Sequence, residues 1–298
     1  MNVLSLFDGM SCGQIALERA CIPVETYYAS EIKKHAIALT QHNYPNTVQI
    51  GSVTELDFNK YKHIDLLIGG SPCQDFSRAN RHETGRQGLK GKKSSLFFKW
   101  LEALKTIQPK YFLLENVKMA QDQQDIISEM VGVEPININS SLVSAQLRNR
   151  LYWTNIPQKG LPVDKGITFQ SVLDSGYTPK QKSRCLICSE KNVLKTAVKR
   201  HYRFVNYLPI NNVWKSKEHF DICQSHFQQN YKGLKSKEIT EKPELYEGIR
   251  ELSRRELERL QTVPEGYTDI LTRNQAADLL GDGWTVDVIV HLLQGLKP

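Results

Sequence analysis

The sequence predicts an α/β fold: a mostly parallel β-sheet with helices on both faces, joined to a small irregular or β-rich second domain. Three observations predict this fold. Short apolar runs alternate with helical patterns up to about residue 157, as in parallel sheets covered by helices. The alternation stops in the polar, basic and aromatic segment 158–250, which contains KRHYRFVNYLPINNVW. Helical patterns return from residue 251, so this segment interrupts one larger domain of residues 1–157 and 251–298.

The elements of the larger domain can be assigned in order along the chain. The runs VLSLF, ETYYAS, IDLLIGG and YFLLENV are short and apolar, as buried strands are. Helical patterns follow them in GQIALERA, KKHAIALTQHN, SLFFKWLEALKTI and a segment that ends in IISEMVG. INSSLVSA and LYWTNI add two strands. ELSRRELERLQ and TRNQAADLL are helical patterns, and VDVIVHLLQ is apolar enough to pack back on the sheet.

Composition limits the class of protein. The 298 residues, 40% of them hydrophobic, suffice for one large and one small domain. No apolar run approaches the roughly 20 residues that span a bilayer, and MNVLSLFDG lacks the features of a secretory signal. We therefore expect a cytoplasmic protein that does not enter a membrane. The six cysteines are scattered, which favours reduced thiols over a disulfide framework.

The positive charge is concentrated in one region. The chain carries a net charge of +7, and residues 158–250 hold 17 Lys and Arg against 9 Asp and Glu. A second basic run, SRANRHETGRQGLKGKKSS, follows the third strand. A regional positive field favours a polyanionic partner such as nucleic acid. An ordinary surface rich in Lys and Arg is the alternative.

Three stretches with chemical side chains lie at predicted strand ends, where parallel α/β sheets bind ligands. LFDGMSCG forms a glycine turn, although a simple tight turn has the same pattern. Glu31 ends the next strand and is able to accept from ribose hydroxyls, unless it is only an exposed carboxylate. In GGSPCQDFS, Pro72 and two glycines can hold Cys73 at the sheet edge as a nucleophile, where a buried structural cysteine is the alternative. Glu115, towards the end of LLENV, and the arginines of QLRNRLYW favour a nucleophilic Cys73 over a structural one.

The ordered set FDGMSCG, GGSPCQDFS, ENV, QLRNR, LSRRELERLQTVPEGY and GDGWTVDV resembles the cytosine-5 DNA methyltransferase family, of the bacterial and phage type. The closing segment LLGDGWTVDVIVHLL is similar to the tail of the animal de novo DNA methyltransferases. The resemblance implies a Rossmann-like S-adenosylmethionine-dependent fold in residues 1–157 and 251–298, with target recognition in residues 158–250.

The resemblance also implies the catalytic residues. Cys73 is expected to add to carbon 6 of a cytosine flipped out of the duplex. Glu115 is expected to protonate or hydrogen-bond ring nitrogen 3, and Arg150, with Arg148, to hold the ring carbonyl. S-adenosyl-L-methionine is the expected cofactor, and no metal is expected. The residues expected to bind the cofactor are Phe7, Asp8, Gly9, Cys12, Gly13, Glu31, Ile32, Ser52, Val53, Pro72, Trp284 and Thr285.

Double-stranded DNA is the expected partner, together with a cognate restriction endonuclease where the protein serves restriction-modification. We expect a monomer on DNA, associated with the nucleoid. By resemblance, the basic loop 76–94 closes over the flipped base and grips phosphates. The predicted DNA contacts are Ser77, Arg78, Arg81, Arg86, Lys92, Lys182, Arg184, Arg200 and Arg203.

Two departures from the family pattern affect the cofactor site, namely Ser52, where many relatives have an acid, and Asp282, where many have asparagine. They leave a modified relative of S-adenosylmethionine as an alternative methyl donor. Within the basic segment, four potential zinc ligands have acceptable local spacing, but a strand without metal is the preferred interpretation. These ligands are Cys185, Cys188, Cys223 and His226.

The residues also argue against three other functions. Relatives that methylate transfer RNA carry a Cys-Phe-Thr signature in this segment, and the chain has none. A catalytically inactive DNA-binding relative is disfavoured because Cys73, Glu115 and Arg150 are all present. A nucleotide-binding oxidoreductase would need a glycine spacing that LFDGMSCG does not provide.

Overall fold

The structure is a computed structural model that describes residues 1–71, 95–187, 211–230 and 248–297. These residues form two compact units. Unit 1 comprises residues 1–140, 149–163 and 284–298, and unit 2 comprises residues 141–148 and 164–283. Each unit is described separately.

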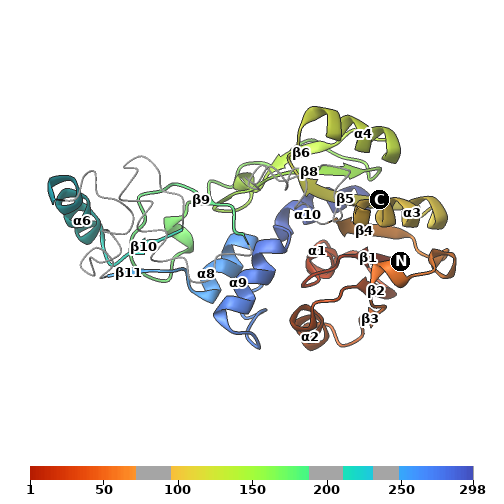
Figure 1. Cartoon of the computed structure of the whole chain (residues 1–298), viewed down its shortest axis with the longest axis horizontal. Coiled ribbons are helices and arrows are strands. Elements are labelled where there is room, and N and C mark those ends of the chain that lie inside the picture. Colours follow the sequence, from red (N-terminus) through yellow and green to blue (C-terminus); the bar gives the residue numbers. More distant parts are fainter. Residues whose placement is uncertain (72–94, 188–210, 231–247, 298) are drawn as a thin grey trace. The chain divides into compact units, whose positions relative to one another are not determined.

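Unit 1 is built on a seven-stranded sheet with the order β3-β2-β1-β4-β5-β8-β6. The strands from β3 to β5 are parallel, and β8 runs antiparallel to both β5 and β6 (Figure 1). The prediction of a mostly parallel sheet with helices is therefore confirmed. The strands are β1 Asn2–Leu6, β2 Thr26–Ser30, β3 Val48–Gln49, β4 Leu66–Gly70, β5 Tyr111–Val117, β6 Ile136–Asn139 and β8 Asn149–Thr154.

Helices cover both faces of this sheet, because alternate strand residues point to opposite sides. One core contains Leu4, Leu67 and Leu114 together with Trp100 and Ile127, and it packs α3 and α4 against one face. The other face carries α1, which packs against α10. The helices of unit 1 are α1 Cys12–Arg19, α2 Lys34–Asn43, α3 Ser95–Ile107, α4 Gln121–Val131 and α10 Val286–Leu293.

Unit 2 contains short strands and three helices among its described residues. Its strands pair as β7 (Gln146–Leu147) with β9 (Ser183–Arg184) and β10 (Val213–Trp214) with β11 (Ile249–Arg250). Its helices are α6 Lys217–Asn230, α8 Arg254–Gln261 and α9 Arg273–Asp282. The sequence does not predict α6. Its buried Cys223 and its Phe220, which contacts the Trp214 ring, give α6 an apolar side.

The compact units divide the chain differently from the predicted domains. Residues 251–283, with α8 and α9, belong to unit 2 and not to the unit that holds the sheet. The functional boundaries 158 and 250 stay a prediction, since compactness and function are separate criteria. In the described part of the chain, no helix is both long and apolar enough to cross a membrane.

Candidate active site

The carboxyl edge of the sheet in unit 1 places Glu115 and Arg150 together. In the antiparallel pair β5 and β8, Arg150 lies opposite Val117, so Arg150 and Glu115 are diagonal neighbours on one face. Arg150 Nε lies 2.9 Å from Glu115 Oε1. Glu115 is buried, with 8% exposure, and a carboxylate in that position needs such a partner.

The second oxygen of Glu115 has another partner from the end of the chain. The indole Nε1 of Trp284 donates a 3.1 Å hydrogen bond to Glu115 Oε2. The parallel register places Gly70, the last residue of β4, beside Glu115. A side chain at Gly70 would put its Cβ 2.8 Å from Glu115 Oε2 and 2.9 Å from Trp284 Nε1. The glycine is therefore what leaves room for this carboxyl group and its donor.

Asn116, the neighbour of Glu115, supports the chain just before the predicted nucleophile. It is buried, and its Nδ2 donates a 3.0 Å hydrogen bond to Ser71 Oγ. Its Oδ1 accepts from the Val117 backbone N–H. Ser71 is also buried, and it precedes Pro72 and Cys73, which lie outside the described residues. Asn116 thus anchors the chain two residues before Cys73.

A buried tyrosine supports the glycine turn after β1. Asp8 accepts a 2.8 Å hydrogen bond from the Tyr27 hydroxyl and another from the Ser11 hydroxyl. Burial raises the pKa of Asp8 to about 6, and the nearby Glu31 adds to this effect. A Cβ at Gly13 would lie 2.7 Å from the Tyr27 hydroxyl, so α1 can approach β2 only because of this glycine.

The same edge has the groups that suit a nucleoside cofactor. Gly9 has a φ of +59° and nothing within 4 Å of the position of a Cβ, so space is open above the turn. Glu31 accepts hydrogen bonds from the backbone N–H groups of Gly9, Ile32 and Lys33, three of the roughly four bonds that a carboxylate can accept. Ile32 is 72% exposed, which is unusual for a large apolar side chain. The Glu31 carboxylate can accept from ribose hydroxyls, and the exposed Ile32 side chain lies next to it in the chain. These two features suit a nucleoside cofactor such as S-adenosylmethionine.

The remaining predicted cofactor residues differ in what they can contact. Phe7 has a φ of 60° and packs partly buried against the sheet core. Ser52 caps a short 3-10 helix and shares a 2.8 Å hydrogen bond with Thr54, so its hydroxyl already has a local partner. The other three are nearly inaccessible and contribute packing at this edge: Cys12, Val53 and Thr285.

Arg148 occupies a different environment from Arg150. It lies in unit 2, is 4% exposed, and its Nη2 donates to the carbonyls of Gly281 and Gly283 at 3.2 and 2.8 Å. Its Nη1 donates to Leu186 O and Gly281 O and lies 3.2 Å from Cys185 Sγ. A cation at the carboxyl end of α9 is favourable for the helix dipole. These contacts indicate a structural task for Arg148, and its predicted catalytic role stays a prediction.

Few of the predicted DNA contacts lie within the described residues. The Lys182 ammonium donates to the carbonyls of Ser141, Ser144 and Ile167 at 2.7, 3.0 and 2.6 Å, which uses all three of its N–H groups. The backbone of Arg184 pairs with the Asn211 amide, and the residue is partly buried. The other predicted contacts lie outside the described residues: Ser77, Arg78, Arg81, Arg86, Lys92, Arg200 and Arg203.

The cysteines considered as zinc ligands have other neighbours. Cys223 Sγ lies 3.4 Å from His219 Nε2 on α6, and Cys185 contacts Arg148. Among the described residues, no three His, Cys, Asp or Glu side chains gather closely enough to hold a metal ion. Cys188 and the side chain of His226 lie outside the described residues. The four described cysteines are free thiols: Cys12, Cys21, Cys185 and Cys223.

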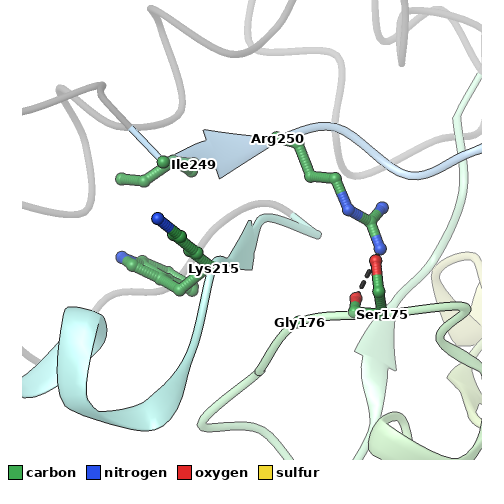
Figure 2. Close-up of a pocket in the computed structure, with 7 residues that line it drawn as sticks. Ser175, Gly176, Lys215, Ile249 and Arg250 are labelled. Atoms are coloured by element: carbon green, nitrogen blue, oxygen red, sulfur yellow. Dashed lines mark hydrogen bonds between the residues drawn. The ribbon is translucent and has the colours of Figure 1, made fainter.

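A pocket of about 310 Å³ lies in unit 2 beside the β10–β11 pair (Figure 2). Arg250 reaches across it to the Ser175 carbonyl and pairs with Glu256, so that its charge is compensated. Lys215 is exposed at its rim. No pattern in the sequence predicts this pocket. It is lined by Ser175, Gly176, Trp214, Lys215, Gly248, Ile249 and Arg250.

Known proteins are similar to this chain in sequence over part of its length. Residues 1–134 match the family model for C-5 cytosine-specific DNA methylase. The orphan methyltransferase M.SPRI of Bacillus phage SPR is 34% identical over 162 residues, 53% of this chain and 35% of that protein. The type II methyltransferase M.NgoBV of Neisseria gonorrhoeae is 35% identical over 131 residues, 42% of this chain and 30% of that protein. The matches thus span about a third of the length of these relatives.

Solved structures resemble the fold over nearly the whole chain. The Entamoeba histolytica methyltransferase EhMeth has a TM-score of 0.71 at 14% identity, covering 100% of this chain and 99% of that one. A DNMT2 mutant of Spodoptera frugiperda has a TM-score of 0.68 at 19% identity, with the same coverage. At these identities the likeness establishes the fold alone. The match over residues 1–134 and the curated relatives support the resemblance drawn from the motifs: this part of the chain is similar to the C-5 cytosine-specific DNA methylase family.

Proposed function

We propose that this protein transfers a methyl group to carbon 5 of a cytosine in a short site of duplex DNA, through a covalent adduct with Cys73. The observation that carries the proposal is the Glu115 carboxyl group, buried beside β4 and held by Arg150 Nε at 2.9 Å. Cys73 follows β4 in the sequence, three residues after Gly70, and lies outside the described residues. An acid, a guanidinium and a thiol form the set that cytosine activation needs, and in this proposal Cys73 supplies the thiol.

Each side chain has a step in the proposed reaction. The Cys73 thiolate adds to carbon 6 and forms a carbon–sulfur bond, while Glu115 donates its proton to ring nitrogen 3 and so neutralises the negative charge. Arg150 orients Glu115 and lies where it can hold the ring carbonyl. After carbon 5 is methylated, a base removes its proton and the thiolate is eliminated, which restores the aromatic ring.

S-adenosylmethionine, when bound, supplies the methyl group. Glu31, with an accepting position left on its carboxylate, would hold the ribose hydroxyls, and the exposed Ile32 would cover the adenine. The open space over Gly9 would admit the polar end of the cofactor. Asp8 and Tyr27 keep this turn in place.

The substrate is proposed to be DNA because the basic charge lies in residues 158–250 and in the run after Cys73. The target base has to leave the stack before the Cys73 thiol can reach its carbon 6. Arg184 of unit 2 stays among the proposed DNA contacts. The Lys182 ammonium donates to three backbone carbonyls, which argues against a phosphate contact at that position.

The relatives have both orphan and type II names, so either an isolated methyltransferase or one paired with a restriction endonuclease fits. Bisulfite sequencing of DNA and of RNA from cells expressing the protein tests the substrate, with Cys73→Ser as the matched control. We expect methylated cytosines in one short DNA sequence and none with the serine variant. Methylation of RNA alone, or equal DNA signals from both forms, would overturn the proposal.

A further inference from the structure

The two oxygens of Glu115 are held by two different donors. Arg150, on the neighbouring strand β8, reaches Oε1, and Trp284, 169 residues away in sequence, reaches Oε2. Each donor occupies one side of the carboxyl group and so fixes its rotation. The resemblance implies that Trp284 lines the cofactor pocket, and nothing in the sequence pattern connects it with Glu115.

Trp284 is fixed in place by the helix that follows it. Thr285, which is 1% exposed, is the N-cap residue of α10, and the Val286, Val288 and Ile289 side chains of α10 are fully buried. Arg19 of α1 forms a 2.5 Å ion pair with Asp287. The position of the indole is therefore set by the docking of α10 on unit 1.

Gly70 completes the arrangement. A Cβ at this position would come within 3.0 Å of both Glu115 Oε2 and Trp284 Nε1, at 2.8 and 2.9 Å. Its φ is not among the positive values, so the backbone itself does not require glycine. The need for glycine at residue 70 is thus the room that the hydrogen bond takes.

We propose that Trp284 is a positioning residue for the general acid: its indole N–H holds Glu115 Oε2 so that the carboxyl proton is presented to the cytosine ring. The inference rests on the proposed role of Glu115 as proton donor. It assigns to Trp284 a task in the chemical step, separate from any contact with the cofactor.

The donor fixes the orientation of the acid. Without the indole N–H, the Glu115 carboxyl group can rotate and presents its proton to the cytosine ring less often. Loss of the indole N–H should therefore lower kcat while the binding of DNA and of S-adenosylhomocysteine is kept.

Trp284→Phe tests this, since it keeps an aromatic ring and removes the donor. Trp153→Phe is the matched control, because Trp153 Nε1 donates a 3.0 Å hydrogen bond to Ser128 Oγ in the same unit, towards α4. We expect kcat of Trp284→Phe to fall about 10- to 100-fold, as for a hydrogen bond to a charged group. Affinities for DNA and for S-adenosylhomocysteine, measured by calorimetry, should change less than about three-fold. The control should keep the parent kcat.

Other outcomes separate the inference from the proposed function. If Trp284→Phe keeps the parent kcat, or only weakens binding of S-adenosylhomocysteine, Trp284 is not a positioning residue and the inference is wrong. A parent protein that methylates no cytosine at all contradicts the proposed function instead. Should Trp284→Phe fold poorly, Gly70→Ala, which intrudes on the same hydrogen bond, must lower kcat while the affinity for S-adenosylhomocysteine is kept. An unchanged kcat in folded Gly70→Ala also overturns the inference.

Discussion

Adjacent residues on β5 serve opposite sides of the sheet edge. Glu115 turns towards Gly70 and Trp284, and Asn116 turns towards Ser71. Strand alternation requires this arrangement, because consecutive side chains point to opposite faces. The pair thus connects the acid with the chain that leads to the nucleophile.

Asn116→Ala should lower kcat about 10- to 100-fold while DNA affinity stays within a factor of two, because the loop before Cys73 loses its anchor. Leaving Ser71 without its buried donor should also cost about 1–3 kcal/mol of unfolding free energy. Steady-state kinetics measures the change in kcat, and urea unfolding measures the change in the free energy of unfolding. Asn155→Ala is the control, since Asn155 also makes two hydrogen bonds to backbone, with Phe112 and Lys110. Equal losses of kcat in both variants would show that Asn116 acts only through stability.

Asp8 predicts a pH dependence of stability. Burial raises its pKa to about 6 from 3.8, so between these values the folded protein binds more protons than the unfolded chain. The stabilisation from its protonated form is complete below about pH 4 and is lost as the pH rises through 6. Asp8→Asn cannot ionise. The parent should therefore lose on the order of 2 kcal/mol relative to this variant between pH 4 and pH 7, measured by urea unfolding. Parallel stability curves would contradict the assignment.

At the residue scale, the sequence predicted Glu115 and Arg150 at one edge because both lie at strand ends. It treated Arg148 as equivalent to Arg150, since both belong to QLRNR. The structure separates them, because Arg148 binds carbonyls of Gly281 and Gly283, more than 130 residues away. No local pattern reveals such partners, and the Trp284 contact with Glu115 was missed for the same reason.

Helix α8 is the element that organises unit 2. Its N-terminus has a capping box of Ser253 and Glu256, which satisfies exposed backbone donors. Glu256 is fully buried, accepts from the Asp174 backbone and pairs with both terminal nitrogens of Arg250. The helix thereby links residue 174 to strand β11.

Glu256→Gln should destabilise unit 2 by about 2–4 kcal/mol, because the guanidinium of Arg250 loses its buried counter-charge. Asp269→Asn is the control, since Asp269 pairs with Arg254 and Arg255 at the surface, where ion pairs contribute little. Chemical unfolding measures the free energy of unfolding of each variant, so that the two substitutions can be compared. If the two substitutions cost the same, the burial of the Glu256 pair carries no special weight.

Most strands and helices of unit 1 could be predicted from sequence because short apolar runs alternate with helical patterns. INSSLVSA, predicted as a strand, is a strand only in its first two residues, and Ser140–Leu142 is a 3-10 helix. Strand β3, only two residues long, was not predicted. Unit 2 was harder to predict. Its described strands are only two residues long, and α6 was missed because SKEHFDICQSHF mixes polar and apolar residues without a clear helical stripe. Its apolar contacts, such as Phe220 with Trp214, depend on tertiary structure.

For the whole molecule, the predicted recognition module can be tested by exchange. Replacing residues 158–250 with the module of a relative of different specificity should move methylation to the relative's site. The contacts that cross the exchanged boundaries include Lys182 with Ser141 and Ser144, and Arg250 with Glu256. The donor module should therefore keep Lys and Arg at these positions. Bisulfite sequencing that still finds the original site would place recognition outside residues 158–250.

Covalent trapping tests the central claim most directly. A DNA duplex with 5-fluorocytosine at the target position lets Cys73 add to carbon 6 and carbon 5 become methylated, but fluorine cannot leave as a proton does. We therefore expect a denaturant-stable complex of protein and DNA that requires S-adenosylmethionine. Cys73→Ser should form none. A serine variant that traps as well as the parent, or a parent that methylates ordinary DNA but never traps, would contradict the assignment of Cys73 as the nucleophile.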